Sequence, residues 1–452
     1  MEAKKQSLLS LFVPIFLETL LLMSTGIVDT FMLTSVPNGV GAVGTANSYI
    51  GMFFIFLSVI STGMMAVMTQ NIGAKKPGVA YQTRQLAIII NGIIGVVISV
   101  FLICLSEPIL RFLGTSEDLL GLATKYMRIV AIGSFFDGLT LIFSSYLRGF
   151  NHSRSPFIVA IIGNILNVAL NALFLYAFKW GVEGVASATV VGKLVILIMM
   201  IIFCRHYVKS KLYKERTSNK AIVIQIFKIG LPAAIESISY SIAMAVVMSF
   251  INKMDVHGFN ATAFSFTTQI TNFAYCTALA LSMANSFLVG WRMGSKNYEK
   301  CYKGTLTVTI IGIGIAIIVE LIFALLGKYL GGIMTSDPNL IQTITWLLYI
   351  DIGLEVGRAT NLVIGKAIKT TGYSLIPSIG SIIINAVIAV TGTYIFGLLL
   401  GWGVLGAMFA MALDEGLRGI FLFIMWQLKK WQNTKVVIKD EEMIVNAGDQ
   451  NV

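Results

Sequence analysis

An acidic side chain, Asp29, lies inside an otherwise apolar stretch that runs from Leu8 to Val36. Glu18 precedes it by nearly three whole helical turns, so both carboxylates share one helix face about 16 Å apart along the axis. Because the two carboxylates share a face, we expect them to share an environment, the interior of a helix bundle. Ionisable groups inside spans are rare and by default mark an ion site or pathway. Asp29 is therefore our first candidate for binding a cation or a proton; the alternative is a packing carboxylate satisfied by hydroxyls and amides.

A second polar set lies in the apolar stretch 156–178. Asn164, Asn167 and Asn171 are spaced by three and four positions, so they form one stripe on a helix. Amides carry no proton load at ordinary pH, but their carbonyl oxygens can coordinate a hard cation or hold a carboxylate in place. With Asp29, this stripe predicts cation chemistry in the first half of the chain.

Two intramembrane pairs carry opposite charges. Glu355 and Arg358 are three positions apart, and Asp414 and Arg418 are four apart, so each pair can form on its own helix. Pairing neutralises charge that lipid would not tolerate. We interpret Asp414 and Arg418 as structural, and leave Glu355 and Arg358 open between a structural and a functional role.

The remaining intramembrane acids lack an obvious partner on their own helix. Glu236 follows Pro232 by one turn, and as a lone acid facing a cavity it would attract cations; a structural role is the alternative. Asp137, Glu320 and Asp351 we interpret as structural or interfacial.

These residues lie in a chain of 452 residues, 56% hydrophobic and 12% charged, with a mean hydropathy of +0.82. The charged fraction is about half that of a soluble globular protein. Twelve apolar stretches are long enough to cross a hydrocarbon layer about 30 Å thick. They cover residues 8–34, 46–72, 85–105, 120–146, 156–178, 184–204, 222–251, 259–288, 303–327, 341–366, 374–400 and 404–427. The sequence predicts an all-α polytopic membrane protein whose first span is not cleaved.

Lys and Arg gather in every second connection between these stretches, from Lys4 and Lys5 to the tail that begins at Lys429. The positive-inside rule then places both termini in the cytoplasm of a multi-pass protein of the plasma or inner membrane. The net charge of +11 lies in short loops beside the spans, so we expect lipid and not nucleic acid as the partner of this charge.

Three sequence blocks recur in the same order in the two halves. VPIFLE, which starts at Val13, matches LPAAIE from Leu231, and GNILN at 163–167 matches SIIIN at 381–385 with the same offset. WGVEG at 180–184 matches WGVLG at 402–406 with nearly that offset. A duplication with six spans per half predicts two six-helix lobes related by a pseudo-two-fold axis along the membrane normal. The expected lobes are residues 1–204 and 222–430, with a cytoplasmic linker at 205–221 and a cytoplasmic tail at 431–452.

Motifs of soluble enzymes are absent from the sequence. There is no Walker loop, so ATP is not the expected energy source. The three His and four Cys show no metal-like spacing. We therefore expect neither an enzyme nor a bound cofactor.

Longer blocks carry a family resemblance over nearly the whole chain. In the first half these are PIFLETLLLMSTGIVDTFML, VGTANSYIG, TQNIGAKK, YLRGFNHSRSPF, GNILNVALN and WGVEGVASATVVG; in the second, GLPAAIES, FLVGWRMGSKNYEK, GLEVGRATNLVIGKAIKTTG and WGVLGAMFAMALDEGLRG. The chain resembles the multidrug and toxic compound extrusion (MATE) family, in a bacterial branch. The resemblance implies a secondary active multidrug efflux antiporter that exports cationic amphiphilic compounds in exchange for inward Na+ or H+ by alternating access.

The resemblance also implies a cation-coupling site made of Asp29, Asn167, Asn171 and Thr189. Many members have Asp on the fifth helix where this chain has Asn171, which leaves Asp29 as the only titratable group of the set and the choice between Na+ and H+ open.

For the substrate cavity the resemblance implies a set from the second half. Other branches have an acid two turns after the proline of the seventh helix, where this chain has Tyr240, and its own acid, Glu236, comes a turn earlier. The full set is Glu236, Tyr240, Gln269, Asn272, Glu355 and Arg358.

Two other functions remain as alternatives. A flippase or exporter of a lipid-linked or specific metabolite, from the same superfamily, would line its cavity with several basic residues to hold a pyrophosphate. The few intramembrane basic residues that we single out are Lys193, Arg358 and Arg418, and two of them have an acid in reach. A membrane-embedded enzyme or receptor is disfavoured by the duplication. We expect small-molecule substrates, a surrounding lipid bilayer and a monomer.

Overall fold

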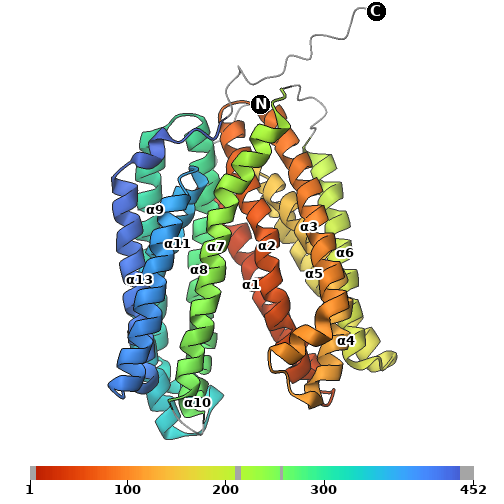
Figure 1. The fold of residues 1–452 in the computed structure, drawn as a ribbon, viewed down its shortest axis with the longest axis vertical. Coiled ribbons are helices and arrows are strands. Elements are labelled where there is room, and N and C mark those ends of the chain that lie inside the picture. Colours follow the sequence, from red (N-terminus) through yellow and green to blue (C-terminus); the bar gives the residue numbers. More distant parts are fainter. Residues whose placement is uncertain (1–6, 209–214, 255–257, 438–452) are drawn as a thin grey trace, which may run out of the picture. The chain divides into compact units, whose positions relative to one another are not determined.

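The computed structural model describes residues 7–208, 215–254 and 258–437, apart from the side chain of Ile27. All the regular elements in these residues are helices (Figure 1). The predicted basic residues Lys4 and Lys5, the middle of the expected linker and the expected tail from residue 438 lie outside the described residues.

Contacts divide the chain into two compact units, of which unit 1 ends at Gly230 and unit 2 covers Leu231–Val436. Unit 1 contains α1 (Leu8–Leu33), α2 (Gly39–Gly73), α3 (Pro77–Phe112), α4 (Glu117–Gly149), α5 (Arg154–Ala172) with the π-helix η1 (Leu173–Ala177), and α6 (Gly181–Tyr207). Unit 2 contains α8 (Phe259–Gly294), α9 (Tyr298–Leu325), α10 (Gly327–Met334), α11 (Pro338–Thr370), α12 (Leu375–Ile384) with the π-helices η3 (Asn385–Val390) and η4 (Thr393–Leu399), α13 (Gly403–Gln427) and the 3₁₀-helix η5 (Lys430–Asn433). Helix α7 (Asn219–Asn252) passes from unit 1 to unit 2.

Eleven helices of the described residues are long and apolar enough to cross a membrane. Helix α13 has 25 residues but carries two acids, Asp414 and Glu415, which both pair with Arg418 of the same helix, and Glu415 also pairs with Arg358 of α11. Because this pairing neutralises charge inside the helix, we count α13 as the twelfth span. The predicted all-α polytopic fold with two lobes is confirmed.

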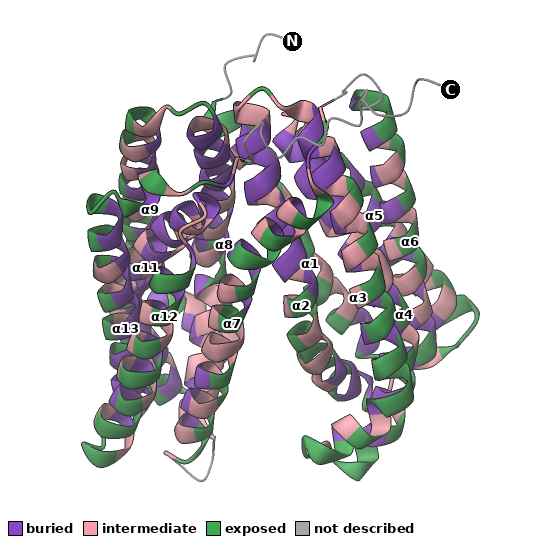
Figure 2. Cartoon of the chain, turned by 45° about the horizontal axis from the view of Figure 1, so that its top comes forward, coloured by how far each residue is buried: buried purple, intermediate pink, exposed green. Residues whose placement is uncertain are grey.

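The outer face of α3 shows how the chain meets lipid. Its exposed apolar side chains include Ile89, Ile93, Val96, Val97 and Val100, whose spacing of three and four positions makes one stripe. Figure 2 shows such exposed faces on the outside of the helices, with buried residues on the sides where helices of a unit meet. An apolar stripe of this size on a soluble surface would be a site of association; on a span it is the face for acyl chains.

Most helices extend beyond the stretches predicted from hydropathy. Helix α2 begins at Gly39 instead of residue 46, and α3 covers Pro77–Phe112 instead of 85–105. Polar residues at the ends of a span lower the hydropathy without stopping backbone hydrogen bonding, so the helix continues past the apolar segment. The short helix α10 and the three π-helical segments were not predicted.

The duplication is visible in the backbone of the connections. Residues with positive φ recur in five pairs, all separated by nearly the offset of the repeated sequence blocks: Asn38 with Gly258, Lys75 with Lys296, Asn151 with Gly372, Lys179 with Gly401, and Gly181 with Gly403. Positive φ is uncommon outside glycine, so matching positions in five pairs are strong support for two copies of one six-helix unit.

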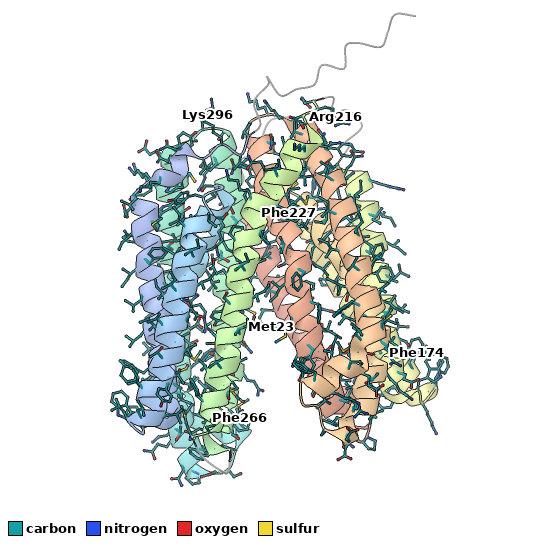
Figure 3. All side chains as sticks on the ribbon, viewed as in Figure 1. Met23, Phe174, Arg216, Phe227, Phe266 and Lys296 are labelled. Atoms are coloured by element: carbon teal, nitrogen blue, oxygen red, sulfur yellow. The ribbon has the colours of Figure 1, made fainter. Side chains whose placement is uncertain are left out.

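The beginning of α7 is fastened to unit 1. The Gln82 side chain, near the start of α3, brackets the backbone of Thr217: its Nε2 donates to the Thr217 carbonyl (2.7 Å) and its Oε1 accepts from the Thr217 amide (3.0 Å). The Gly78 amide donates to Glu215 (3.0 Å). Arg216, labelled in Figure 3, lies at the end of unit 1 opposite Phe174. The chain that leads into α7 is therefore held at the start of α3.

Two glycines then let α7 approach α2 closely. A Cβ on Gly63 would lie 2.1 Å from the Ile226 carbonyl oxygen, and a Cβ on Gly230 would lie 2.3 Å from the Val59 carbonyl oxygen. Both contacts are backbone to backbone, so no side chain can move aside to make room.

We expect Gly63→Ala to lower the free energy of unfolding by about 1–3 kcal/mol, because the added methyl group forces the two helices apart. The measurement is thermal unfolding of the purified protein in detergent. Gly51→Ala, on the same helix with no atom within 4 Å of its Cβ, is the matched control and should change stability by less than about 1 kcal/mol. Equal effects of the two variants would contradict the close approach.

Candidate cation site and buried charge networks

The structure brings Asp29 of α1 together with the asparagine stripe of α5, two helices that pack on each other. Asn171 Nδ2 donates to Asp29 Oδ1 at 2.6 Å and lies 3.2 Å from Asn167 Oδ1. Asn171 is fully buried, and its Oδ1 has no hydrogen-bond partner among the described residues. A buried acceptor without a donor, directly beside a carboxylate, suits a cation.

Local sequence explains this placement. Asn167 and Asn171 are four apart and therefore lie on one face of α5. The π-helix η1 begins at Leu173, just after Asn171, and such departures from α-helical geometry are frequent at functional sites. The third member of the stripe, Asn164, is not in this contact; its Nδ2 is buried without a partner in the described part of the chain.

Helices α4 and α6 complete the surroundings. Thr189 Oγ1 donates to the Val185 carbonyl at 2.9 Å, which leaves its oxygen able to accept. Tyr126 hydrogen-bonds with the side chains of Thr189 and Asn47 and lies beside Asp29. We did not single out Tyr126 or Asn47 from the sequence. An isolated Tyr among apolar residues carries no signal, whereas Asn47, a polar residue within an apolar stretch, could have been noticed.

Asp29 has no basic partner among the described ion pairs. Those pairs engage acids that include Glu18, Asp137, Glu236 and Glu355, but not Asp29. One carboxylate with neutral amide and hydroxyl oxygens balances a single positive charge. The arrangement can hold one proton or one monovalent cation.

Glu18 and Asp29 both contact other helices of unit 1, as their shared helix face predicts, but their partners differ. Glu18 Oε2 lies 2.6 Å from Arg148 on α4, and the two side chains are only 12% and 7% exposed. In unit 2, Glu236 Oε2 lies 2.8 Å from Lys369 on α11. The interpretation of Glu236 as a lone acid is therefore wrong. The two pairs correspond in the duplication, since the acids and the bases are each separated by nearly the offset of the repeated blocks.

A second pair of matched positions has reversed charges. In unit 1 Lys193 on α6 lies 2.7 Å from Asp137 on α4. At nearly the same offset, Asp137 corresponds to Arg358 and Lys193 to Glu415. In unit 2, Arg358 Nε lies 3.5 Å from Glu415 Oε1. The duplication thus kept an ion pair between the fourth and sixth helices of each half and exchanged its acid for its base.

Arg358 and Arg418 organise a larger network in unit 2. Arg358 also pairs with Glu355, and Arg418 binds Asp414 through two hydrogen bonds of 3.0 and 2.6 Å and Glu415 at 2.9 Å. Amide groups support the acids: Asn385 donates to Asp414 and Asn361 to Glu415, each at 2.8 Å. The predicted pairs Glu355/Arg358 and Asp414/Arg418 are confirmed, and Glu415 joins them.

The other residues of the expected substrate cavity lie near this network or on the surface. Arg418 lies over the Tyr240 ring at 5.3 Å, and Arg358 lies over Tyr275 at 5.5 Å. Gln269 and Asn272 are exposed on α8. Their role in binding a substrate stays a prediction.

Glu320 and Asp351 are buried inside unit 2, with exposed fractions of 0% and 1%. The interfacial interpretation of these two residues is therefore wrong. Their carboxyl groups lie within hydrogen-bonding reach of each other, across the packed helices α9 and α11.

Comparison with known proteins agrees with the duplicated fold. The sequence model of the MatE family matches residues 14–173 and 232–395, two segments that begin at Pro14 and Pro232. The chain belongs to this family. Members of the family are transporters, so the protein is a multi-pass membrane transporter.

Individual relatives cover the full architecture. The uncharacterized transporter YisQ of Bacillus subtilis is 30% identical over 95% of both chains. The probable multidrug resistance protein NorM of Thermotoga maritima is 25% identical over 96% of this chain and 95% of its own. An outward-facing multidrug resistance MATE transporter has a TM-score of 0.86 at 20% identity, covering 95% of this chain and 96% of that one. The MATE transporter ClbM, solved with Rb+, has a TM-score of 0.82 at 19% identity, covering 94% and 96%.

We expect Glu18→Gln to destabilise the protein by about 3–5 kcal/mol, because it leaves the Arg148 guanidinium buried without its counter-charge. Unfolding by heat, measured in detergent, reports the loss. Glu299→Gln is the control, since Glu299 pairs with Lys303 on the surface, where pairs contribute little.

The double variant Glu18→Gln/Arg148→Met should recover much of the lost stability, because no buried charge remains unpaired. A Glu18→Gln protein as stable as Glu299→Gln would show that the ion pair does not hold α1 to α4.

Proposed function

We propose that this transporter is a secondary active antiporter that exports cationic amphiphilic small molecules in exchange for inward Na+ or H+, with Asp29 as the exchange point. The observation that carries the proposal is a half-buried carboxylate, hydrogen-bonded to a buried amide and without a basic partner among the described residues. A carboxylate paired with Lys or Arg is already neutralised before an ion arrives, whereas Asp29 forms no such pair among the described residues.

Antiport requires that the coupling ion and the drug favour different states of the protein. Ionised Asp29 attracts the ion, and binding cancels the charge on α1. Unit 1 then rearranges and the affinity for drug falls. By linkage, drug binding lowers the affinity for the ion by the same factor.

The donor set fits a monovalent ion. For Na+, the ligands would be the Asp29 carboxylate with oxygens of Asn167, Asn171 and Thr189, since hard cations prefer oxygen. For H+, Asp29 alone would take the proton and the amides would hold its side chain in place. The solved transporter ClbM, in complex with Rb+, is a precedent in this fold for a bound monovalent cation.

We place the drug site among residues of unit 2: Glu236, Tyr240, Gln269, Asn272, Glu355 and Arg358. Glu236 and Glu355 are both paired with bases, so a cationic drug would compete with Lys369 or Arg358 for these carboxylates. Aromatic rings at Tyr240 and Tyr275, already under guanidinium groups, suit a cation by the same attraction.

Export of a lipid-linked or specific metabolite is the less favoured alternative. A pyrophosphate needs basic groups that are free to bind it. Lys193, Arg358 and Arg418 all contact acids in unit 1 or unit 2, so these three are already neutralised. We further propose a monomer in the plasma or inner membrane, with both termini in the cytoplasm.

We expect Asp29→Asn to abolish efflux driven by an ion gradient, because the amide cannot alternate between charged and neutral. The measurement is transport of a fluorescent cation by purified protein in liposomes with an imposed Na+ or H+ gradient. Asp118→Asn, an exposed acid in the first turn of α4, should transport like the wild type.

The same liposomes identify the coupling ion. At fixed pH, transport that requires a Na+ gradient assigns Na+ to Asp29, and transport driven equally without Na+ by a pH gradient assigns H+. Full gradient-driven efflux by Asp29→Asn would remove Asp29 from the mechanism.

A further inference from the structure

The buried acids Glu320 and Asp351 are not explained by the function proposed above. Both Glu320 oxygens and Asp351 Oδ2 lack a hydrogen-bond donor among the described residues. Both side chains are nearly or fully shielded from solvent. A buried acceptor without a donor costs about 1–3 kcal/mol, and more for a charged group, so three such oxygens in one place call for a ligand.

A proton is the ligand that fits. Two carboxylates within hydrogen-bonding reach repel each other strongly in a buried site, and such pairs hold one proton between them. With that proton, one carboxyl group donates to the other and the repulsion disappears. No group of three His, Cys, Asp or Glu in the described chain is arranged to hold a metal ion, which disfavours a divalent cation here.

The nearby arginines cannot take the place of the proton. Arg358 is engaged by Glu355 and Glu415, and Arg418 by Asp414 and Glu415. The two guanidinium groups therefore already pair with three carboxylates, those of Glu355, Glu415 and Asp414. Glu320 and Asp351 form no ion pair within the described residues.

The charged and titratable groups that face the pair come from several helices. They are Glu355 and Arg358 on α11 and Glu415 on α13, with Tyr275 on α8 and Tyr240 on α7 reached only through the arginines. On the neighbouring helix α10, Lys328 and Tyr329 are exposed and thus point away from the buried pair. None of these described groups is a basic side chain that is free to pair with Glu320 or Asp351.

Glu355 connects the pair to the surface of unit 2. It lies one turn after Asp351 on the same face of α11, and its Oε2 has no hydrogen-bond partner in the described part of the protein. Its partner Arg358 has a side chain that is 15% exposed. Glu355 therefore lies between the carboxyl pair and a side chain that is partly exposed to solvent.

We propose that Glu320 and Asp351 form a second proton-binding site, in unit 2, which holds one proton at neutral pH and exchanges it with water through Glu355. The site does not involve Asp29 and does not rest on the proposed export function. Loss of the proton leaves two adjacent carboxylates, so the deprotonated state needs a cation or a rearrangement of unit 2 to stabilise it.

Infrared spectroscopy of the purified full-length protein tests the proposal directly. At neutral pH we expect an absorption band of a protonated carboxyl group that shifts when water is replaced by D2O. The band should persist in Asp29→Asn, which excludes the unit 1 site as its source. It should also persist in Glu299→Gln, the control acid at the other end of α9, and disappear when Glu320→Gln/Asp351→Asn is combined with Asp29→Asn.

Three results would overturn the proposal: no protonated carboxyl band in Asp29→Asn, a band that survives when Glu320→Gln/Asp351→Asn is combined with Asp29→Asn, or a band that does not shift in D2O. The last result would identify a sealed structural pair. If the double variant does not fold, Glu320→Asp keeps a carboxyl pair, and its band must remain and change frequency; an unchanged band would place the proton elsewhere.

Discussion

The neutralisation of buried acids is the constraint on which this structure depends. Each unit contains carboxylates inside long apolar helices, where an uncompensated charge is expensive. The chain meets this cost in three ways: with a base on another helix, as for Glu18 and Arg148; with an amide, as for Asn171 beside Asp29; and, by our proposal, with a proton shared between two acids. In the last two cases no base is paired with the carboxylate among the described residues, so its charge can change when an ion or proton binds, and we propose ion exchange there.

The duplication shows which of these solutions the two halves share. The pairs Glu18/Arg148 and Glu236/Lys369 occupy matching positions in the two halves, as do the left-handed residues of the connections. A feature kept in both copies points to a need that both copies share, the packing of six helices, and in unit 2 we propose that Glu236 also belongs to the drug site. Asp29, in contrast, has Val247 at the matching position. The ion pair between the fourth and sixth helices is an intermediate case. Both halves keep the contact, but the helix that carries the acid in one half carries the base in the other.

Spacing along the sequence predicted the contacts between residues of the same helix. The stripe of Asn167 and Asn171, the pair Glu355/Arg358 and the pair Asp414/Arg418 follow from separations of three or four positions. Contacts between helices did not follow, because sequence does not show which faces meet. The partners Glu18 and Arg148 lie on the first and fourth helices, with two whole spans between them in the sequence. Glu320 and Asp351 looked like two isolated acids for the same reason.

Helix α7 has a consequence for a chain that is cut in the linker. Its first turns are bound to unit 1 through Gln82 and the close contacts at Gly63 and Gly230, although in the duplicated gene product they open the second copy. A chain cut between residues 208 and 215 would therefore still carry, on its second fragment, a segment whose packing partners lie in the first. The two fragments should therefore reassociate through this segment. The boundary between the units then lies within α7, next to Pro232, which has no backbone N–H to donate.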